Sequence, residues 1–255
     1  MGGPTPLGWE ATLGVVVAWL LVMARVLGLC LTAPGLAAPG LSWRFRLGAT
    51  VMLTMVLAPP LTGRMPVSSH MISSAWMGVG EGLAGAMLGL SAGLIVAGAR
   101  AAGEMVASQA GLSTATFFDP EAGEESTAIG RLYGGMALVG FLAMGGPVAM
   151  VRSLAASYEV IPPGGLPISE SMAADLFGRV GQTLELSLRL AAPTAMALIL
   201  AGIAMAWLGR AAPSVPMLIL ALPIRVVAGL VLILIGLSML AMALSGAWGG
   251  LLGAG

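Results

Sequence analysis

The chain has 255 residues, of which 58% are hydrophobic and only 9% are charged, and its mean hydropathy is +0.99. Soluble globular domains carry about 25% charged residues, so this composition excludes an ordinary soluble protein and predicts a membrane protein. The net charge is zero, and the eleven basic residues are all arginines, placed singly apart from the close pair Arg44 and Arg46. This scatter excludes a nucleic-acid-binding surface.

The amino-terminal segment predicts a first membrane helix that stays in the mature protein. Met1 to Glu10 contains no Arg or Lys, whereas a cleaved signal peptide begins with a positively charged region. The apolar stretch from Ala11 to Ala24 is expected to end at Arg25, after which the chain stays apolar through Leu31.

Few later segments are long and apolar enough for an unbroken membrane helix, which needs about 20 residues. The clean candidates are Leu132 to Val151, Leu190 to Gly209 and Val226 to Gly255, and Gly82 to Ala99 is marginal.

The remaining apolar segments are short or interrupted. Leu47 to Leu61 finishes in two prolines, Met105 to Phe118 contains polar residues and stops at Asp119-Pro120, and three prolines cut Ala211 to Ile224. Lipid cannot satisfy the backbone N–H and C=O groups exposed at such breaks. Either these segments are re-entrant and packed inside an assembly, or much of the chain lies outside the hydrocarbon layer.

Many of the 38 glycines are spaced four residues apart, which allows helix backbones to approach closely. Glycine is also common in membrane helices generally, so a close-packing role for any single pair stays one of two alternatives. The clearest ladders are Gly78, Gly82, Gly85 and Gly89, and Gly130 with Gly134.

Three polar segments separate the apolar ones. Asp119 to Arg131 is acidic and predicts a solvated loop, and Glu159 to Glu170 is rich in proline and glycine and predicts a rigid connector. Ser171 to Arg189 predicts an amphipathic helix, because its polar residues fall within about a third of the helix circumference. Its acid-first pairs, Asp175 with Arg179 and Glu185 with Arg189, have the favourable i, i+4 order.

Ionisable residues within apolar segments are costly in a membrane, so each is a candidate functional residue. Arg100 and Glu104 share a helix face and form either an internal ion pair or a proton relay, and Glu81 either lines a wet path or marks a helix end. Arg152 is expected to snorkel from the end of the Leu132 to Val151 helix. The full set is Arg25, Glu81, Arg100, Glu104, Arg152 and Arg225.

The sequence contains no recognisable catalytic or metal-binding pattern. The absence of lysine excludes a lysine-containing phosphate-binding loop, and Cys30 and His70 are the only residues of their types. We therefore expect no enzyme, no metal site and no cofactor.

One stretch has a specific resemblance to a known family. The run from Gly103-Glu104 through Gln109-Ala110-Gly111-Leu112-Ser113 to Asp119-Pro120 resembles the signature of the FliR/SctT family of type III protein export. Further segments agree in the same order, so the resemblance covers essentially the whole chain. They are Arg25-Val26 with Ala33-Pro34, Arg44-Phe45-Arg46-Leu47-Gly48, Ile161-Pro162-Pro163-Gly164-Gly165, and Arg210-Ala211-Ala212-Pro213 with Leu222-Pro223-Ile224-Arg225.

The resemblance implies an all-α membrane protein, whose broken helices and helical hairpins pack in a helical multi-subunit export-gate assembly. Residues 1–255 would form a single membrane domain without enzymatic activity. The implied partners are FliP-like and FliQ-like subunits, an FlhB-like switch protein, unfolded export substrates and membrane lipid, with no nucleic acid. The implied location is the flagellar basal body in the bacterial inner membrane.

The family's pore-closing loop, or plug, corresponds to Gln109 to Asp119. Small residues there would give a mobile backbone, and the two phenylalanines would seal a channel by excluding water. Alternatively, the phenylalanines are only core anchors at the end of a helix. The candidate plug residues are Gln109, Gly111, Leu112, Ser113, Thr114, Phe117, Phe118 and Asp119.

Two alternatives to a flagellar export-gate subunit remain at this point. One is the SctT-type subunit of a virulence injectisome. The other is a secondary transporter with broken helices and a midplane site built from Glu81, Arg100 and Glu104. A transporter of this kind would show similarity between its two halves, and the sequence shows none.

Overall fold

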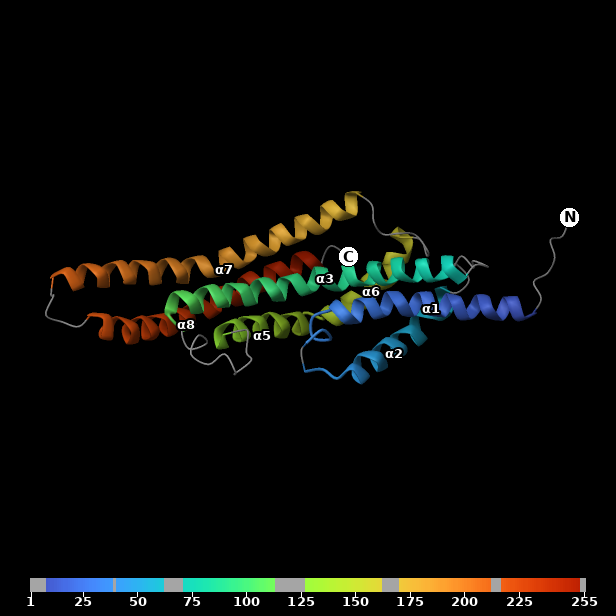
Figure 1. The fold of residues 1–255 in the computed structure, drawn as a ribbon, viewed down its shortest axis with the longest axis horizontal. Helices are drawn as coiled ribbons and strands as arrows, with labels where there is room; N and C mark the ends of the chain where they lie inside the picture. Colours follow the sequence, from blue (N-terminus) through green and yellow to red (C-terminus); the bar gives the residue numbers. More distant parts are fainter. Residues whose placement is uncertain are drawn as a thin grey trace. The chain divides into compact units, whose positions relative to one another are not determined.

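The computed structural model describes residues 8–38, 40–61, 71–112, 127–161, 170–211 and 217–252. These residues form α-helices joined by turns and contain no strand (Figure 1), which confirms the predicted all-α class. In chain order the helices are α1 (Gly8–Thr32), α2 (Trp43–Leu61), α3 (Met71–Ala110), α5 (Ala128–Ala143), α6 (Gly146–Val160), α7 (Glu170–Ala211) and α8 (Met217–Leu252).

Several of these helices are long and apolar enough to cross a membrane. Within the described ranges the candidate spans are Leu13–Thr32, Ser74–Ala110 and Phe177–Ala211. The bent pair of α5 and α6 meets the same criteria only when taken together, which gives up to four spans if the pair is one span. The fold is therefore that of an all-α membrane protein.

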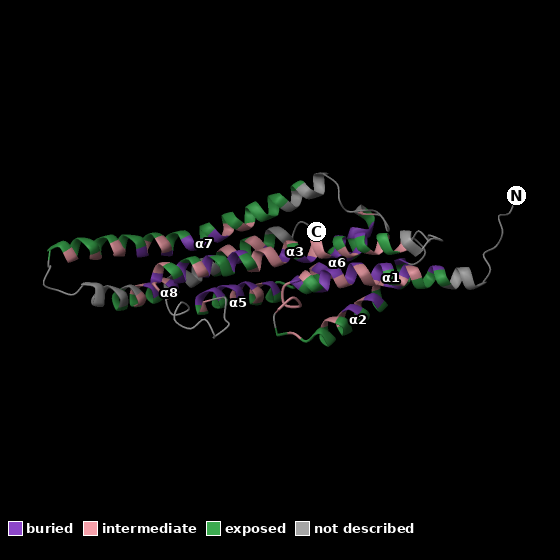
Figure 2. Cartoon of the chain, viewed as in Figure 1, coloured by how far each residue is buried: buried purple, intermediate pink, exposed green. Residues whose placement is uncertain are grey.

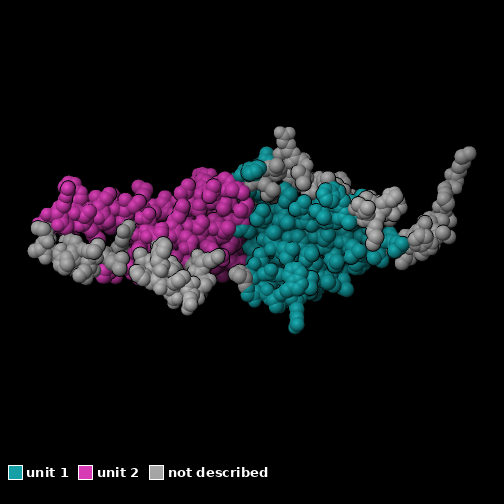
Figure 3. Space-filling model, viewed as in Figure 1, with its two compact units in different colours: residues 1–93, 147–179, 255 teal, residues 94–146, 180–254 magenta. Residues whose placement is uncertain are grey.

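The chain divides into two compact units, each assembled from separate parts of the sequence (Figure 3). The first unit contains residues 1–93, 147–179 and 255, and the second contains residues 94–146 and 180–254. Contacts inside each unit therefore join residues far apart in the chain. The expectation of one membrane domain stays a prediction.

Glycines let α1 and α3 pack backbone against backbone in the first unit. Figure 2 shows the buried residues of α1 in purple. A Cβ atom added to Gly85 would lie 1.8 Å from the carbonyl oxygen of Arg25, and one added to Gly28 would lie 2.0 Å from that of Gly82. The predicted close-packing role is thus confirmed at Gly85. Gly78, the first member of the same ladder, has nothing within 4 Å of an added Cβ.

The core of the second unit includes a contact between α5 and α8. Trp248 is fully buried, and its Nε1 donates a hydrogen bond to the carbonyl oxygen of Ala137 at 3.1 Å. Its ring lies 5.0 Å from the ring of Phe141, a spacing typical of aromatic pairs. α8 begins at Met217 and contains Pro223, so its start is earlier than the predicted Val226.

The segment Leu132 to Val151 is not the unbroken span that its composition predicts. The chain bends by 68° between α5 and α6. Gly145 has φ +74° and its N–H donates to the carbonyl oxygen of Leu142 at 3.1 Å, a helix-terminating geometry that favours glycine. Pro147 follows in the first turn of α6, where a missing N–H is tolerated, so the sequence Gly145-Gly146-Pro147 explains the break.

Two other predicted boundaries are also wrong. α1 does not end at Arg25 but continues to Thr32, and α3 joins the segments predicted at Gly82 to Ala99 and Met105 to Phe118 into one helix as far as Ala110. Arg25 does not interrupt α1 because the protein itself neutralises its charge, as described next.

Candidate functional site

Two of the charges predicted to be functional meet in the interior of the first unit. The Nε atom of Arg25 on α1 lies 2.6 Å from Oε2 of Glu81 on α3, and both side chains are fully buried. The residues are 56 positions apart, so the sequence identified each charge but not their pairing. Glu81 thus neither lines a wet path nor marks a helix end.

The rest of the Arg25 guanidinium is held by α6 and by Ile161, the residue that follows α6. Nη1 donates to Oγ of Ser157 at 3.0 Å, and Nη2 donates to the carbonyl oxygen of Ile161 at 3.3 Å. The guanidinium carbon lies 4.0 Å from the centre of the Tyr158 ring, within the range of a cation–π interaction. We call Arg25, Glu81, Ser157, Tyr158 and Ile161 the buried arginine cluster.

The buried arginine cluster joins α1, α3 and α6, which are far apart in the sequence. A buried ion pair gains little net free energy over an apolar pair, because both charges lose their hydration. Removing one partner is much costlier, about 3–5 kcal/mol, since the other charge is left buried. The cluster therefore fixes how α1, α3 and α6 pack, and disfavours other packings.

Glu104 on α3 has a different task, in the second unit. Its Oε1 accepts a hydrogen bond from the backbone N–H of Thr127 at 2.9 Å. Thr127 is the N-cap residue of α5, and its Oγ1 accepts from the N–H of Gly130 at 3.1 Å. Glu104 therefore ties the end of α3 to the start of α5, on either side of residues 111–126.

This arrangement resembles a capping box divided between two helices. In a capping box a Glu or Gln three residues after the N-cap accepts from the N-cap N–H. That position is Gly130 here, and a Cβ on Gly130 would lie 2.0 Å from Oε1 of Glu104. Glu104 supplies from α3 the carboxylate that α5 lacks, and glycine at position 130 leaves room for it.

Arg100 does not pair with Glu104, although the two are four residues apart. Among the described residues Arg100 forms no ion pair, and its side chain is exposed. Its Nε lies 3.3 Å from where a Cβ of Gly134 would be. Gly134 therefore leaves room beside α5 for the side chain of Arg100.

Gly111 terminates α3 in a defined geometry. Its φ is +78°, and its N–H donates to the carbonyl oxygen of Ser108 at 3.1 Å. The N–H of Leu112 donates to the carbonyl oxygen of Ala107 at 3.0 Å. These two bonds form a Schellman motif, in which glycine takes the left-handed position. We call Glu104, Gly111, Thr127 and Gly130 the loop base.

The other candidate residues are placed as follows. Gln109 lies in the last turn of α3, whereas Ser113, Thr114, Phe117, Phe118 and Asp119 lie outside the described residues. The backbone of Arg225 belongs to α8, but its side chain is not described. Arg152 is exposed within α6, not at a helix end. The predicted pair of Glu185 with Arg189 is confirmed and is exposed on α7.

Sequence reasoning missed three residues of these sites. Ser157 and Tyr158 were not singled out, because nothing in the local pattern shows that Arg25 lies beside them. Thr127 could have been recognised as an N-cap, since a threonine directly precedes the apolar run of α5. Within the described ranges, no three His, Cys, Asp or Glu side chains are grouped so that they could hold a metal ion.

Comparison with known proteins identifies the chain. The family model described as bacterial export proteins, family 1, matches residues 16–251. The chain belongs to this family. Three relatives named flagellar biosynthetic protein FliR come from Pectobacterium carotovorum (31% identity), Escherichia coli K12 (31%) and Caulobacter vibrioides (28%). The alignments cover 81%, 82% and 91% of this chain and 78%, 79% and 93% of the relatives.

The family assignment confirms the resemblance drawn from the sequence signature. The loop base and the buried arginine cluster both lie inside the matched residues 16–251. The residues of the signature, from Gly103-Glu104 to Gly111-Leu112, are those that contact α5 and end α3. This bacterial export protein is thus a membrane-embedded component of the flagellar export apparatus.

Proposed function

We propose that this chain is a non-enzymatic subunit of the flagellar type III export gate in the bacterial inner membrane. It would form the channel for unfolded flagellar proteins together with FliP-like and FliQ-like subunits and would contact an FlhB-like switch protein. The observation that carries this proposal is the family match over residues 16–251, with FliR relatives aligned over most of their own length. The injectisome and transporter alternatives are not favoured by these relatives.

The exposed surface supports a role inside an assembly. Large apolar side chains are exposed along α7, including Phe177 at 77% and Trp207 at 73%. Large exposed apolar side chains are typical of surfaces that contact other proteins or lipid. Helices that leave so much apolar surface uncovered fit a subunit whose partners complete its packing.

The loop after α3 is the part of the chain that we assign to pore closure. The proposed plug comprises Gln109 to Asp119, and it begins in the last turn of α3, beside the loop base. Gly111 and Leu112 fix the residue at which α3 stops, and Glu104 fixes Thr127 at which α5 starts.

A conductance measurement tests the plug. Replacing Phe117 and Phe118 together by alanine should increase the leak of ions through the assembled gate, because the hydrophobic constriction is lost. Phe177→Ala, on exposed α7, is the matched control and should leave conductance unchanged. The comparison requires co-purified complex with normal subunit composition. Conductance equal to the unsubstituted complex in the double variant would contradict the plug assignment.

A further inference from the structure

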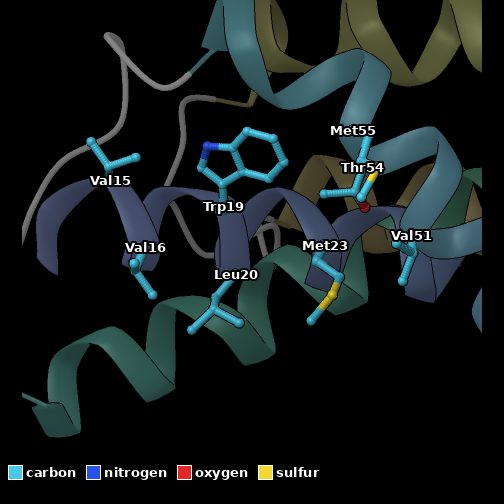
Figure 4. Close-up of a pocket in the computed structure, with 8 residues that line it drawn as sticks. All are labelled: Val15, Val16, Trp19, Leu20, Met23, Val51, Thr54 and Met55. Atoms are coloured by element: carbon cyan, nitrogen blue, oxygen red, sulfur yellow. The ribbon is translucent and has the colours of Figure 1, made fainter. Parts of the chain in front are cut away.

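An apolar groove lies on the first unit between α1 and α2 (Figure 4). Its walls are formed by residues 15–23 of α1 and residues 51–55 of α2. Its volume is about 360 Å³. This is within the range of about 300–1,000 Å³ typical of small-molecule sites. The groove is partly open to the surface. The lining residues are Val15, Val16, Trp19, Leu20, Met23, Val51, Thr54 and Met55.

The groove contains almost no polar group that could bind a hydrophilic ligand. The hydroxyl of Thr54 donates instead to the carbonyl oxygen of Thr50 at 2.7 Å, and both are buried. Figure 4 shows the indole of Trp19 beside the α2 residues and the side chains of Leu20 and Met23 along α1. The chemistry of the walls is that of a site for a hydrocarbon chain.

The start of α2 supplies the opposite chemistry. Trp43 is 52% exposed, and Arg44 beside it is exposed and makes no hydrogen bond or ion pair among the described residues. Tryptophan and arginine are the residues that gather at the membrane interface, where the ring meets the headgroups and the guanidinium meets phosphate. The start of α2 therefore has the composition of a headgroup-binding surface.

Helical geometry connects this surface to the groove. Val51 and Met55 follow Arg44 by seven and eleven residues. At 100° per residue, the direction of each around the helix axis differs from that of Arg44 by about 20°, so all three lie on one face of α2. Val51 is about 10 Å from Arg44 along the helix axis, which corresponds to the step from a lipid phosphate into the acyl region. Gly48 lies between Arg44 and Val51 in the sequence. A Cβ atom added to Gly48 would have nothing within 4 Å, so the surface of α2 is open at this position.

We propose that the α1–α2 groove binds an anionic phospholipid, with the phosphate on Arg44 and an acyl chain along Val51, Met55 and Trp19. Arg44 selects a lipid with net negative charge, because a zwitterionic headgroup carries its own cation beside the phosphate. The apolar side chains of the groove then hold the acyl chain. The proposal depends on the geometry of α1 and α2 alone and does not require the plug or the export function.

Photolabelling of the full chain in its membrane tests the proposal. Membrane vesicles containing the protein would be doped with phosphatidylglycerol or with phosphatidylcholine, each carrying a diazirine in one acyl chain. After illumination, labelled positions are mapped by mass spectrometry. We expect phosphatidylglycerol to label Val51, Met55 and Trp19 about fivefold more than phosphatidylcholine, the ratio given by one arginine near an anionic headgroup.

Two variants and two controls separate the headgroup from the groove. Arg44→Gln should reduce phosphatidylglycerol labelling to the phosphatidylcholine level, and Val51→Trp should remove groove labelling by both lipids. Arg152→Gln changes an exposed arginine on α6, and Met52→Trp adds the same ring on exposed α2 outside the groove, so both should leave labelling unchanged. Equal labelling by the two lipids would show ordinary lipid contact and overturn the proposal. Absence of lipid adducts in the groove of the unsubstituted protein, as when a protein partner fills it, would overturn it as well.

Discussion

Two carboxylates of α3, Glu81 in the first unit and Glu104 in the second, are held in different ways. Glu81 is fully enclosed and pairs with a guanidinium from another helix. Glu104 is half-buried and accepts from the backbone N–H of Thr127 at the start of α5. The second position is favourable for a carboxylate because the N-terminal end of a helix carries partial positive charge.

The difference lies in what remains when the carboxylate is removed. Without Glu81, the cation of Arg25 stays in a site that excludes water. Without Glu104, one backbone N–H at the end of a helix loses its partner, and water can replace it. The same residue type on the same helix should therefore have very different effects on stability in the two units.

The largest effect is expected from Glu81→Ala. This substitution leaves Arg25 buried and unpaired, and should lower the free energy of unfolding by about 3–5 kcal/mol. The double variant Arg25→Met with Glu81→Leu removes both charges and should recover most of that loss, since apolar pairs of similar volume replace buried ion pairs well. Equilibrium unfolding of the full chain in mixed micelles, titrated with SDS, measures both. A double variant as unstable as Glu81→Ala would contradict the ion-pair explanation.

A smaller loss is expected where the same unit depends on glycine. In Gly85→Ala the new methyl group meets the carbonyl oxygen of Arg25, which is backbone and moves only if α1 and α3 separate. Overpacking of this kind costs about 1–3 kcal/mol. Gly78→Ala on the same helix has open space and should instead gain up to about 1 kcal/mol of helix propensity. The unfolding titration should give the two substitutions opposite signs, and equal losses would contradict backbone contact at Gly85.

Composition and motif spacing were enough to predict the class of the fold and the family. They also identified which charges were costly, including Arg25, Glu81 and Glu104, because any charge in an apolar segment needs a partner. The identity of each partner was not predictable, since it depends on how separate helices pack: Glu81 is 56 residues from Arg25, and Glu104 is 23 residues from Thr127. Arg100 illustrates this limit. The i, i+4 spacing on α3 favours Glu104 as its partner, whereas the carboxylate of Glu104 accepts a hydrogen bond from the N–H of Thr127 at the start of α5.

Two glycines that end helices are visible in the sequence itself. The run Gly145-Gly146-Pro147 contains the terminating glycine and first-turn proline that break α5 from α6, yet apolar composition alone predicted a continuous span. Gly111, which the proposed plug includes, has a second and local role. Its left-handed backbone and the paired bonds to Ser108 and Ala107 give it a fixed role in ending α3.

The smallest effect is expected at the loop base, and two substitutions of Glu104 separate charge from hydrogen bonding. Glu104→Ala removes the acceptor for the Thr127 N–H and should cost about 1 kcal/mol, the usual loss for a helix cap. Glu104→Gln keeps an acceptor oxygen at the same reach, so it should retain most of the stability and lose only the charge–dipole contribution. Amide hydrogen exchange at Thr127 provides a local measurement: exchange should accelerate in the alanine variant and change little in the glutamine variant. Equal acceleration in both would mean that the negative charge, and not the hydrogen bond, holds the start of α5. A Cβ added to Gly103 on α3 would lie 2.8 Å from the Cα atom of Gly130, so the two helix backbones are close there. Unchanged exchange in both variants would mean that this backbone packing holds the two helices without Glu104.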